Sequence, residues 1–272
     1  MSGKAHLVEG EHQLALIEGP LTALSLVTII PVRTNTTFDR ITGGRILASL
    51  PFVGAIVGLL GLALISTGLL LHLSATLIAV TVVVCWQLFN RFMHLDGLSD
   101  VADALGSYAP AKKAQEILAD PHLGLIGGAS AVLVLFIQIF SLSTLIESQW
   151  YLLIVPAAIA SRIGALIGCH QKFSPMKPTG FAALMVGTVR SWWIIAWILL
   201  SIVLGYVLLP AVFAWLIFSI IGALVITVCA ARHCARRFGG LNGDTNGFLI
   251  MLTESVILFF LACCASAVTI TV

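Results

Sequence analysis

Charge is scarce in this chain: Asp, Glu, Lys and Arg together make up 10% of its 272 residues, whereas 59% of the residues are hydrophobic. About a quarter of the residues of an ordinary soluble domain are charged, so this composition excludes that class. Apolar runs of roughly 20 residues recur, and a helix of that length crosses the ~30 Å hydrocarbon core of a bilayer. We therefore expect an all-α fold, a polytopic integral membrane helical bundle.

Metal-binding motifs of cysteine and histidine are also missing. The six cysteines contain no Cys-x-x-Cys pair, and the seven histidines form no tract. The spacing of Cys229, His233 and Cys234 does not suit structural zinc, so thiols buried in membrane helices are the simpler interpretation. The N-terminal residues include Lys4 and two glutamates without a small-residue cleavage site, which predicts that no signal peptide is removed.

Seven apolar segments predict membrane spans, the second of them short: 46–71, 76–90, 123–146, 151–169, 191–209, 211–230 and 249–270. A further apolar segment, 14–31, contains Glu18 and Pro20. We expect it to be a re-entrant or interfacial helix, with a full span as the alternative. No internal repeat is evident, so residues 1–272 are predicted to form a single membrane-embedded domain.

Basic residues lie in alternate connections between these spans. Twelve of the fourteen Lys and Arg residues fall in four segments, namely 32–45, 91–122, 170–190 and 231–248. The other connections between spans, 72–75, 147–150 and the join at Pro210, contain no Lys or Arg. Because positively charged loops stay in the cytoplasm, we predict that all four segments face the cytoplasm, at the cytoplasmic membrane of a bacterium or archaeon. Every polar motif then lies on one side, which predicts a one-sided active site.

Three aspartates, Asp96, Asp100 and Asp103, follow one another at spacings i, i+4 and i+7. On a helix these positions fall within about 60° of arc, so three negative charges lie on one face. Like charges this close destabilise a helix unless a cation neutralises them, and Mg²⁺ is typically held by one or two carboxylates together with substrate phosphates. The pattern predicts a metal site for phosphate chemistry, with a solvated acidic turn as the alternative. His94, just before it, is either a catalyst or a structural hydrogen-bonding residue.

Two glycine-rich segments are candidates for binding phosphate. Asp120 precedes a helix start that contains Gly124 and Gly127, and the N–H groups of a helix N-terminus favour phosphate. Helix packing explains these glycines equally well. The second segment, 239–247, combines four glycines with Asp244 in a flexible polar loop. Such a loop presents N–H groups to phosphate or a carboxylate to a metal, and a simple flexible turn is the alternative.

Two arginines are candidate anion ligands. Arg162 lies within a predicted span, where a charge needs a partner or a polar cavity. It therefore either pairs with a carboxylate or binds a substrate phosphate. Arg45 either contacts an anion or extends to the membrane interface. Glu254, about two turns into the last span, is either functional or an interfacial or protonated side chain.

These segments, in this order, resemble those of the adenosylcobinamide-GDP ribazoletransferase family, also called cobalamin-5′-phosphate synthase. The family segment His-Leu-Asp-Gly-Leu-Ala-Asp-x-x-Asp-Gly corresponds to 94–104, which reads HLDGLSDVADA. The family segment Gly-Gly-x-Thr-Gly-Asp-x-x-Gly corresponds to 239–247. The family segment Ile-Met-Lys/Arg-Asp-Ser-Arg-x-Gly-x-x-Gly corresponds to 117–127. The resemblance covers nearly the whole chain, from about residue 20 to residue 260.

Several positions depart from the family pattern. His122 stands where the family usually has Arg, and Ala119 replaces a basic residue. Pro121 replaces Ser, Asn242 replaces Thr, and Ala104 replaces Gly. No departure removes a carboxylate. The changes affect which cation contacts the nucleotide phosphates, and Lys112 and Lys113 are possible substitutes.

The resemblance implies a membrane phosphotransferase that joins α-ribazole, or its 5′-phosphate, to adenosylcobinamide-GDP. The products are adenosylcobalamin, or its 5′-phosphate, and GMP, in the last step of nucleotide-loop assembly. We expect Mg²⁺ as the cofactor and the lipid bilayer as the surroundings of the protein. A homodimer is a further expectation, and no nucleic-acid partner is expected.

The candidate residues take roles in that reaction. The catalytic candidates are His94, Asp96, Asp100, Asp103 and Asp120. The metal candidates are Asp96, Asp100, Asp103, Asp120 and Asp244. The substrate-binding candidates are Arg45, Gly124, Gly127, Arg162, Arg236, Gly240, Gly243, Asp244, Thr245 and Gly247.

Two other functions are alternatives. A CDP-alcohol phosphotransferase of lipid synthesis also uses clustered aspartates, but its Asp-x2-Asp-Gly-x2-Ala-Arg pattern is absent from this sequence. A membrane transporter typically has charges at the bilayer midplane, broken helices and an inverted repeat. The carboxylates here gather in segments predicted to be cytoplasmic, and substrate-dependent release of GMP separates an enzyme from a carrier.

Overall fold

The computed structural model describes residues 12–32 and 38–270, and within these ranges every regular element is a helix. The expectations for Lys4 and Arg33 lie outside the described residues. Five short helices accompany the long ones: Ala15–Val27 (α1), Ala75–Phe89 (α3), Met93–Gly106 (α4), Ala111–Leu118 (α5) and Phe181–Met185 (α9).

Six helical segments are long and apolar enough to cross a bilayer. They are Arg40–Leu70 (α2), Leu125–Glu147 (α6), Tyr151–Gly168 (η1, Tyr151–Leu153, with α7, Ile154–Ser161, and α8, Ile163–Gly168), Ser191–Leu208 (α10), Phe213–Phe238 (α11) and Gly243–Ile270 (α12). The remaining predicted span corresponds to α3, whose 15 residues extend about 22 Å. It qualifies as a span only together with α4, which bends away by 88°. The prediction of a polytopic helical bundle is confirmed, with six spans or seven if this pair is one.

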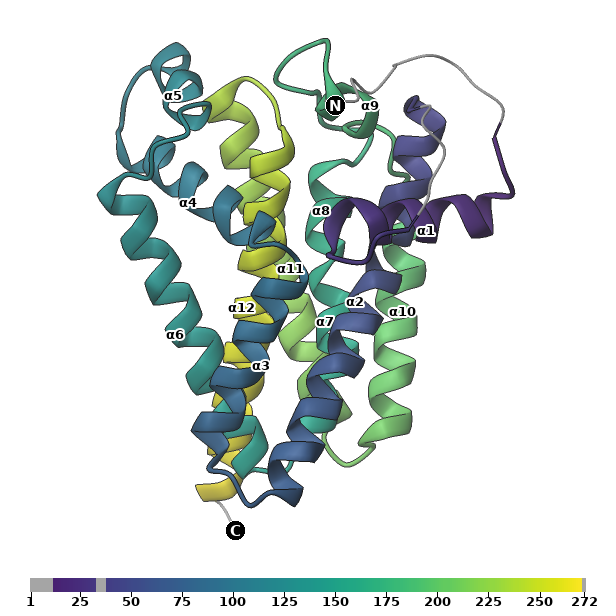
Figure 1. Ribbon diagram of the computed structural model, residues 1–272, viewed down its shortest axis with the longest axis vertical. Coiled ribbons are helices and arrows are strands. Elements are labelled where there is room, and N and C mark those ends of the chain that lie inside the picture. The colour runs from purple at the N-terminus through teal and green to yellow at the C-terminus, as the bar shows by residue number, and fades with distance from the viewer. Residues whose placement is uncertain (1–11, 33–37, 271–272) are drawn as a thin grey trace.

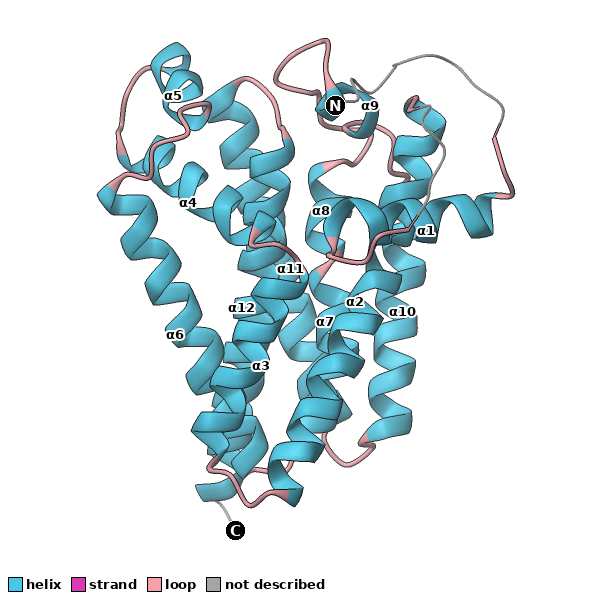
Figure 2. Ribbon diagram, viewed as in Figure 1, coloured by secondary structure: helices cyan, strands magenta, loops and turns pink. Residues whose placement is uncertain are grey.

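The polar segments gather at one end of the bundle, which we call the charged end. Figure 1 shows α4, α5 and α9 at this end, together with the connections that precede α9 and α12. The opposite end consists of short turns between long helices (Figure 2). The aspartate segment and the glycine-rich segments therefore lie at one end as predicted, whereas Arg162 lies inside the bundle.

The broken helix α7–α8 forms the centre of the bundle, and every residue from 153 to 169 is buried. Arg162 lies at the break and is 2% exposed. Its guanidinium donates to the carboxylate of Glu254 on α12 and to the hydroxyl of Ser161, the latter at 2.6 Å. Of the two roles expected for Arg162, the structure contains the ion pair. A buried charge that loses such a partner costs about 3–5 kcal/mol.

Helix α1 lies across α2 at the charged end (Figure 1). Its 13 residues extend about 20 Å, which is too short to cross a bilayer. The alternative of a full span at 14–31 is therefore wrong, and the expectation of an interfacial or re-entrant helix fits. Leu26 and Val27, at the end of α1, line a cavity described below.

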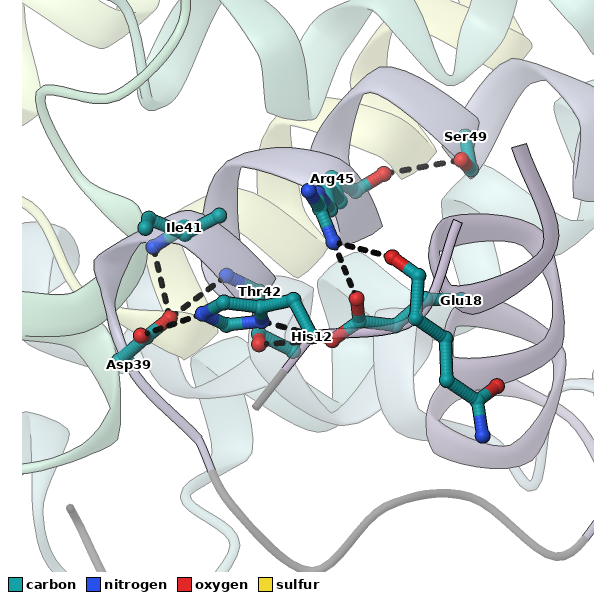
Figure 3. Close-up of polar contacts among 8 residues, drawn as sticks. His12, Glu18, Asp39, Ile41, Thr42, Arg45 and Ser49 are labelled. Carbon is teal, nitrogen blue, oxygen red and sulfur yellow. Dashed lines mark hydrogen bonds and ion pairs between the residues drawn. The ribbon is translucent and has the colours of Figure 1, made fainter. Parts of the chain in front are cut away.

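A polar cluster fastens α1 to α2 (Figure 3). The carboxylate of Glu18 accepts hydrogen bonds from the guanidinium of Arg45 and, at 3.0 Å, from the hydroxyl of Thr42. His12 lies between Glu18 and Asp39, at 3.3 Å and 2.9 Å. Burial by itself would raise the pKa of Glu18, but the bonds from His12, Arg45 and Thr42 lower it, so the carboxylate stays charged. Arg45, a candidate phosphate ligand, is thus already paired within the protein.

Candidate active site

Helix α4 begins after a sharp turn. Arg91 and Phe92 both have left-handed backbone conformations there, with φ values of 54° and 56°. The chain then forms a 14-residue helix that carries all three predicted aspartates. Asp96 is exposed, and Asp100 and Asp103 are half-buried. The helical spacing inferred from the sequence is confirmed.

Gly97 allows α4 to pack closely against the first turn of α12. A Cβ atom at Gly97 would lie 2.6 Å from the carbonyl oxygen of Asp244, so a larger residue would separate the two helices. The contact brings together carboxylates that are far apart in the sequence. We call Asp96, Asp100 and Asp244 the carboxylate cluster.

The carboxylates of this cluster repel one another. Burial and, after it, the negative charges of Asp96, Asp244 and Asp103 together raise the pKa of Asp100 to about 6. A proton therefore neutralises part of the charge close to neutral pH. A bound cation would relieve the same repulsion. A proton and a cation therefore compete for the carboxylate cluster.

Asp103 has different surroundings. One of its carboxylate oxygens accepts a hydrogen bond from the N–H of Gly124 and the other from the N–H of Gly127, both at 2.8 Å. These N–H groups belong to the first turn of α6, which leaves backbone donors unpaired and favours negative charge. A Cβ atom at Gly127 would lie 2.3 Å from the Asp103 carboxylate. The glycines predicted to bind a substrate phosphate therefore already bind a carboxylate of the protein.

Two cavities meet at the first turn of α12. The first has a volume of about 320 Å³ and is enclosed by α1, α2, α4, α8, α9 and α12, with Asp96 in its wall. The second has a volume of about 290 Å³ and lies among α5, α9 and the connections that precede α9 and α12. Four residues line both cavities: Phe181, Ala182, Gly243 and Asp244. Asp244 therefore joins a mainly apolar cavity to a more polar one.

Two buried polar atoms beside the first cavity have no hydrogen-bond partner among the described residues. They are Nε2 of His94 and Oδ1 of Asn246. Burial, followed by the nearby charge of Arg162, lowers the pKa of His94 to about 3, so its imidazole is neutral. Unpaired buried polar atoms are costly. Oδ1 of Asn246 lies against α8, where a Cβ atom at Gly168 would be 2.1 Å from it. Nε2 of His94 is therefore the better candidate for a hydrogen bond to a ligand.

The loop predicted at 239–247 is shorter than expected, because α12 begins at Gly243. Asn242 caps this helix: its side-chain oxygen accepts from the N–H of Thr245 at 3.0 Å, and the Thr245 hydroxyl accepts from the N–H of Asn242 at 2.8 Å. Asn is as good an N-cap as Thr, so this departure from the family pattern leaves the helix start intact. Thr245, a candidate substrate ligand, is buried within the cap.

The glycines of this segment have separate positions. Gly240 packs against the backbone of Met176, where a Cβ atom would lie only 2.6 Å from the nitrogen. Gly243 has open space around it, and Gly247 lines the first cavity. Two of the three glycines predicted to bind substrate therefore lie beside the cavities.

The remaining candidates lie apart from the carboxylate cluster. Asp120 is exposed and lines neither cavity, and hydrogen bonds from the side chain and backbone of His122 lower its pKa. Arg236 lines a separate groove. Arg45 and Arg162 are paired with carboxylates of the protein itself.

Lys177 was not among the sequence candidates, yet it lines the second cavity together with Asp244. Its connection is held in place by two main-chain hydrogen bonds. The N–H of Met176 donates to Leu241 at 2.9 Å, and the N–H of Leu241 donates to Ser174 at 3.0 Å. Lys177 is exposed and belongs to none of the ion pairs found among the described residues. Lys177 belongs to no recognisable sequence motif. Its position beside the second cavity is therefore visible only in the structure.

The donor set suits a hard divalent cation that is shared with a substrate. Among the described residues, no three His, Cys, Asp or Glu side chains converge closely enough to hold a metal ion by themselves. Mg²⁺ needs only one or two carboxylates when phosphate oxygens and water complete its coordination. The repulsion within the carboxylate cluster and the open space beside Gly243 both fit that arrangement.

The fold and the site define a class: a multi-pass helical membrane protein with a carboxylate cluster between two cavities at one end of the bundle. The model of the cobalamin-5-phosphate synthase family matches residues 19–262. The chain belongs to this family.

Similar proteins extend over nearly the whole chain. Two proteins named adenosylcobinamide-GDP ribazoletransferase, from Corynebacterium diphtheriae and Corynebacterium efficiens, are each 46% identical to it. The matches cover 92% and 99% of this chain and 93% and 100% of those proteins. A protein of the same name from Frankia casuarinae is 31% identical over 89% of this chain and 93% of its own length. No solved structure matches the chain.

Proposed function

We propose that this chain is a phosphotransferase that joins α-ribazole, or its 5′-phosphate, to adenosylcobinamide-GDP and releases GMP. The observation that carries the proposal is the carboxylate cluster at the meeting point of two cavities, in a chain that belongs to this family. The printed name of the relatives gives the reaction class. A lipid-forming phosphotransferase or a transporter has no comparable support from the matches.

The residues around the cavities take complementary roles in this proposal. Asp96 and Asp244, which line the first cavity, would hold a Mg²⁺ ion shared with the diphosphate of the donor. Such an ion would neutralise negative charge on the oxygens of the attacked phosphate and of the leaving phosphate. Lys177 contacts the nucleotide phosphates from the second cavity. His94, whose buried Nε2 lacks a partner among the described residues, orients the substrate by a hydrogen bond.

The transfer itself exchanges one P–O bond for another. A hydroxyl of the ribazole attacks the phosphorus next to cobinamide, the bond to the bridging oxygen breaks, and GMP leaves with that oxygen. The proton of the hydroxyl passes to a carboxylate. Asp100 suits that task best, because a general base works most efficiently when its pKa is near the working pH. Asp120 suits it less, because hydrogen bonds from His122 lower its pKa.

The charged end is proposed to face the cytoplasm, where nucleotide substrates are available. The support is the distribution of basic residues, since positively charged connections remain on the cytoplasmic side. The far end has no Lys or Arg in its connections. A cysteine introduced at position 73 is expected to react with an impermeant thiol reagent from outside, and one introduced at position 108 only after permeabilisation. The reverse pattern would contradict this orientation.

The direct test is release of GMP by the purified protein in liposomes. Adenosylcobinamide-GDP, α-ribazole 5′-phosphate and Mg²⁺ are supplied, and reactions with EDTA or without acceptor serve as controls. We expect GMP and cobalamin 5′-phosphate in equal amounts, dependent on both acceptor and metal. Absence of turnover in a folded sample would refute the proposed reaction, and turnover that EDTA leaves unchanged would refute the role of Mg²⁺.

A further inference from the structure

A groove of about 890 Å³ runs between α10 and α11, away from the carboxylate cluster. The two helices are packed tightly at the far end, where a Cβ atom at Gly205 would lie 2.2 Å from the Leu216 side chain. The rings of Tyr206 and Phe213 also meet there, with centroids 5.1 Å apart. Towards the charged end α10 and α11 border the groove, and Ile167 of α8 contributes to its lining.

The walls of this groove are apolar and its mouth is cationic. Isoleucine, leucine and valine side chains of α10 and α11 form the walls, and Lys172, Arg232 and Arg236 lie at the charged end. All three cations are exposed, and no ion pair found among the described residues includes them. Among the residues that the structure describes, no carboxylate lines the groove. The groove therefore offers an unneutralised positive charge above an apolar channel.

The length of the groove matches one leaflet of a bilayer. From Ile221 to Arg236, the 15 residues of α11 rise about 22 Å. Half of a ~30 Å hydrocarbon core plus the headgroup region of one leaflet is of about the same depth. An elongated amphipathic molecule with an anionic head fits both the length and the charge pattern.

We infer that this groove binds an anionic phospholipid of the charged-end leaflet. Lys172, Arg232 and Arg236 contact the headgroup phosphate, and an acyl chain lies along the wall formed by Ile195 and Val225. Basic pockets between membrane helices favour anionic lipids for this reason. A second copy of the chain is a poor occupant, because two-fold pairing would place the cationic mouths against each other.

The substrate is also a poor occupant of this groove. None of the residues that line it lines either cavity at Asp244. The inference is therefore independent of the proposed reaction. A lipid held here covers an otherwise hollow face of α10 and α11 and stabilises both helices.

Cys229 provides a native reporter, since it lines the groove and is exposed. Cys263, which is exposed on α12 and does not line the groove, is the internal control. The full-length protein, purified in detergent, is labelled with a maleimide in the presence of phosphatidylglycerol or phosphatidylcholine. Peptide mass spectrometry follows both thiols. We expect phosphatidylglycerol to slow labelling of Cys229 at least about fivefold relative to phosphatidylcholine, an effect comparable to one cation–headgroup contact, with Cys263 unchanged.

Variants locate the site. Arg232→Gln combined with Lys172→Gln should abolish the protection, and Lys113→Gln, which changes a cation elsewhere at the charged end, should preserve it. Val225→Trp should fill the channel and prevent lipid binding, whereas Val132→Trp, at another exposed valine of a span, should not. Equal protection by both lipids, or protection that survives Arg232→Gln with Lys172→Gln, would overturn the inference. Protection by adenosylcobinamide-GDP, or protection without lipid that rises with protein concentration, would assign the groove to substrate or to a second copy instead.

Discussion

Two helices of this protein begin in glycine-rich segments, and only one of these helix starts is open. At the start of α6, the carboxylate of Asp103 occupies the N–H groups of Gly124 and Gly127. At the start of α12, Gly243 has no neighbouring heavy atom within 4 Å of a Cβ position, and Asp244 lines two cavities. The comparison teaches that a glycine-rich helix start is available to a substrate only where the protein does not already supply the anion.

The largest effect is expected at the open helix start. Asp244→Asn and Asp96→Asn should each lower turnover at least about 100-fold, because each removes a proposed ligand of the Mg²⁺ whose positive charge would stabilise the transition state. The fold should be retained, since both side chains lie at cavity walls. Rates of GMP release are measured on samples whose unfolding temperature matches that of the native protein. Near-native turnover in either variant would remove the carboxylate cluster from the mechanism.

Alanine substitutions at the two helix starts should have different effects on the free energy of unfolding. A methyl group at Gly127 would overlap the Asp103 carboxylate, so Gly127→Ala should destabilise the protein by about 1–3 kcal/mol. Gly243→Ala meets open space and should change the free energy of unfolding by no more than about 0.5 kcal/mol. Denaturation in mixed micelles measures both variants. Equal free energies of unfolding for the two variants would contradict the distinction between a closed start of α6 and an open start of α12.

A smaller effect is expected at Lys177. Lys177→Gln should raise the KM for adenosylcobinamide-GDP about 10-fold, because a charged contact to phosphate contributes about 1.5–3 kcal/mol at most. Lys177→Arg should restore most of the affinity. Lys113→Gln is the matched control, since Lys113 is exposed and pairs with Glu116 in α5. An unchanged KM for Lys177→Gln would leave the second cavity without a phosphate ligand.

The smallest effect concerns pH. The pKa of Asp100 is raised from 3.8 to about 6. The folded, metal-free protein therefore binds this proton more tightly than the unfolded chain does, and it loses stability as the pH rises from about 4 through 6. Mg²⁺ competes with the same proton, so it should raise the unfolding temperature more at pH 7.5 than at pH 5. Asp100→Asn should remove that difference, and a native protein whose response to Mg²⁺ is independent of pH would contradict the coupling.

Local patterns predicted much of this structure. The hydrophobic runs located the long helices to within a few residues, except that α2 and α12 start earlier and α11 ends later than expected. The distribution of basic residues correctly placed the motifs at one end. The spacing of Asp96, Asp100 and Asp103 correctly predicted a single helical face.

Contacts between distant segments were not predictable in the same way. Asp103 has the same spacing signal as Asp96 and Asp100, but its carboxylate is directed to the start of α6 by packing of α4 on α6. The ion pair between Arg45 and Glu18 depends on α1 crossing α2. Lys177 lines the same cavity as Asp244 only because two connections are joined by main-chain hydrogen bonds. Periodicity reports the face of a helix, whereas these contacts depend on which helices become neighbours.

The most direct test compares Asp244→Asn with Asp103→Asn. Both replace one aspartate, at the open and the closed helix start, and acceptor-dependent GMP release is measured per folded molecule alongside the unfolding temperature. We predict that Asp244→Asn retains at most about 1% of native turnover with unchanged stability. Asp103→Asn should retain more than about 10% of turnover but lose about 1–3 kcal/mol of stability, because its side chain caps α6. Near-native turnover of Asp244→Asn, or an equally inactive but fully stable Asp103→Asn, would contradict the assignment of the chemistry to the carboxylate cluster.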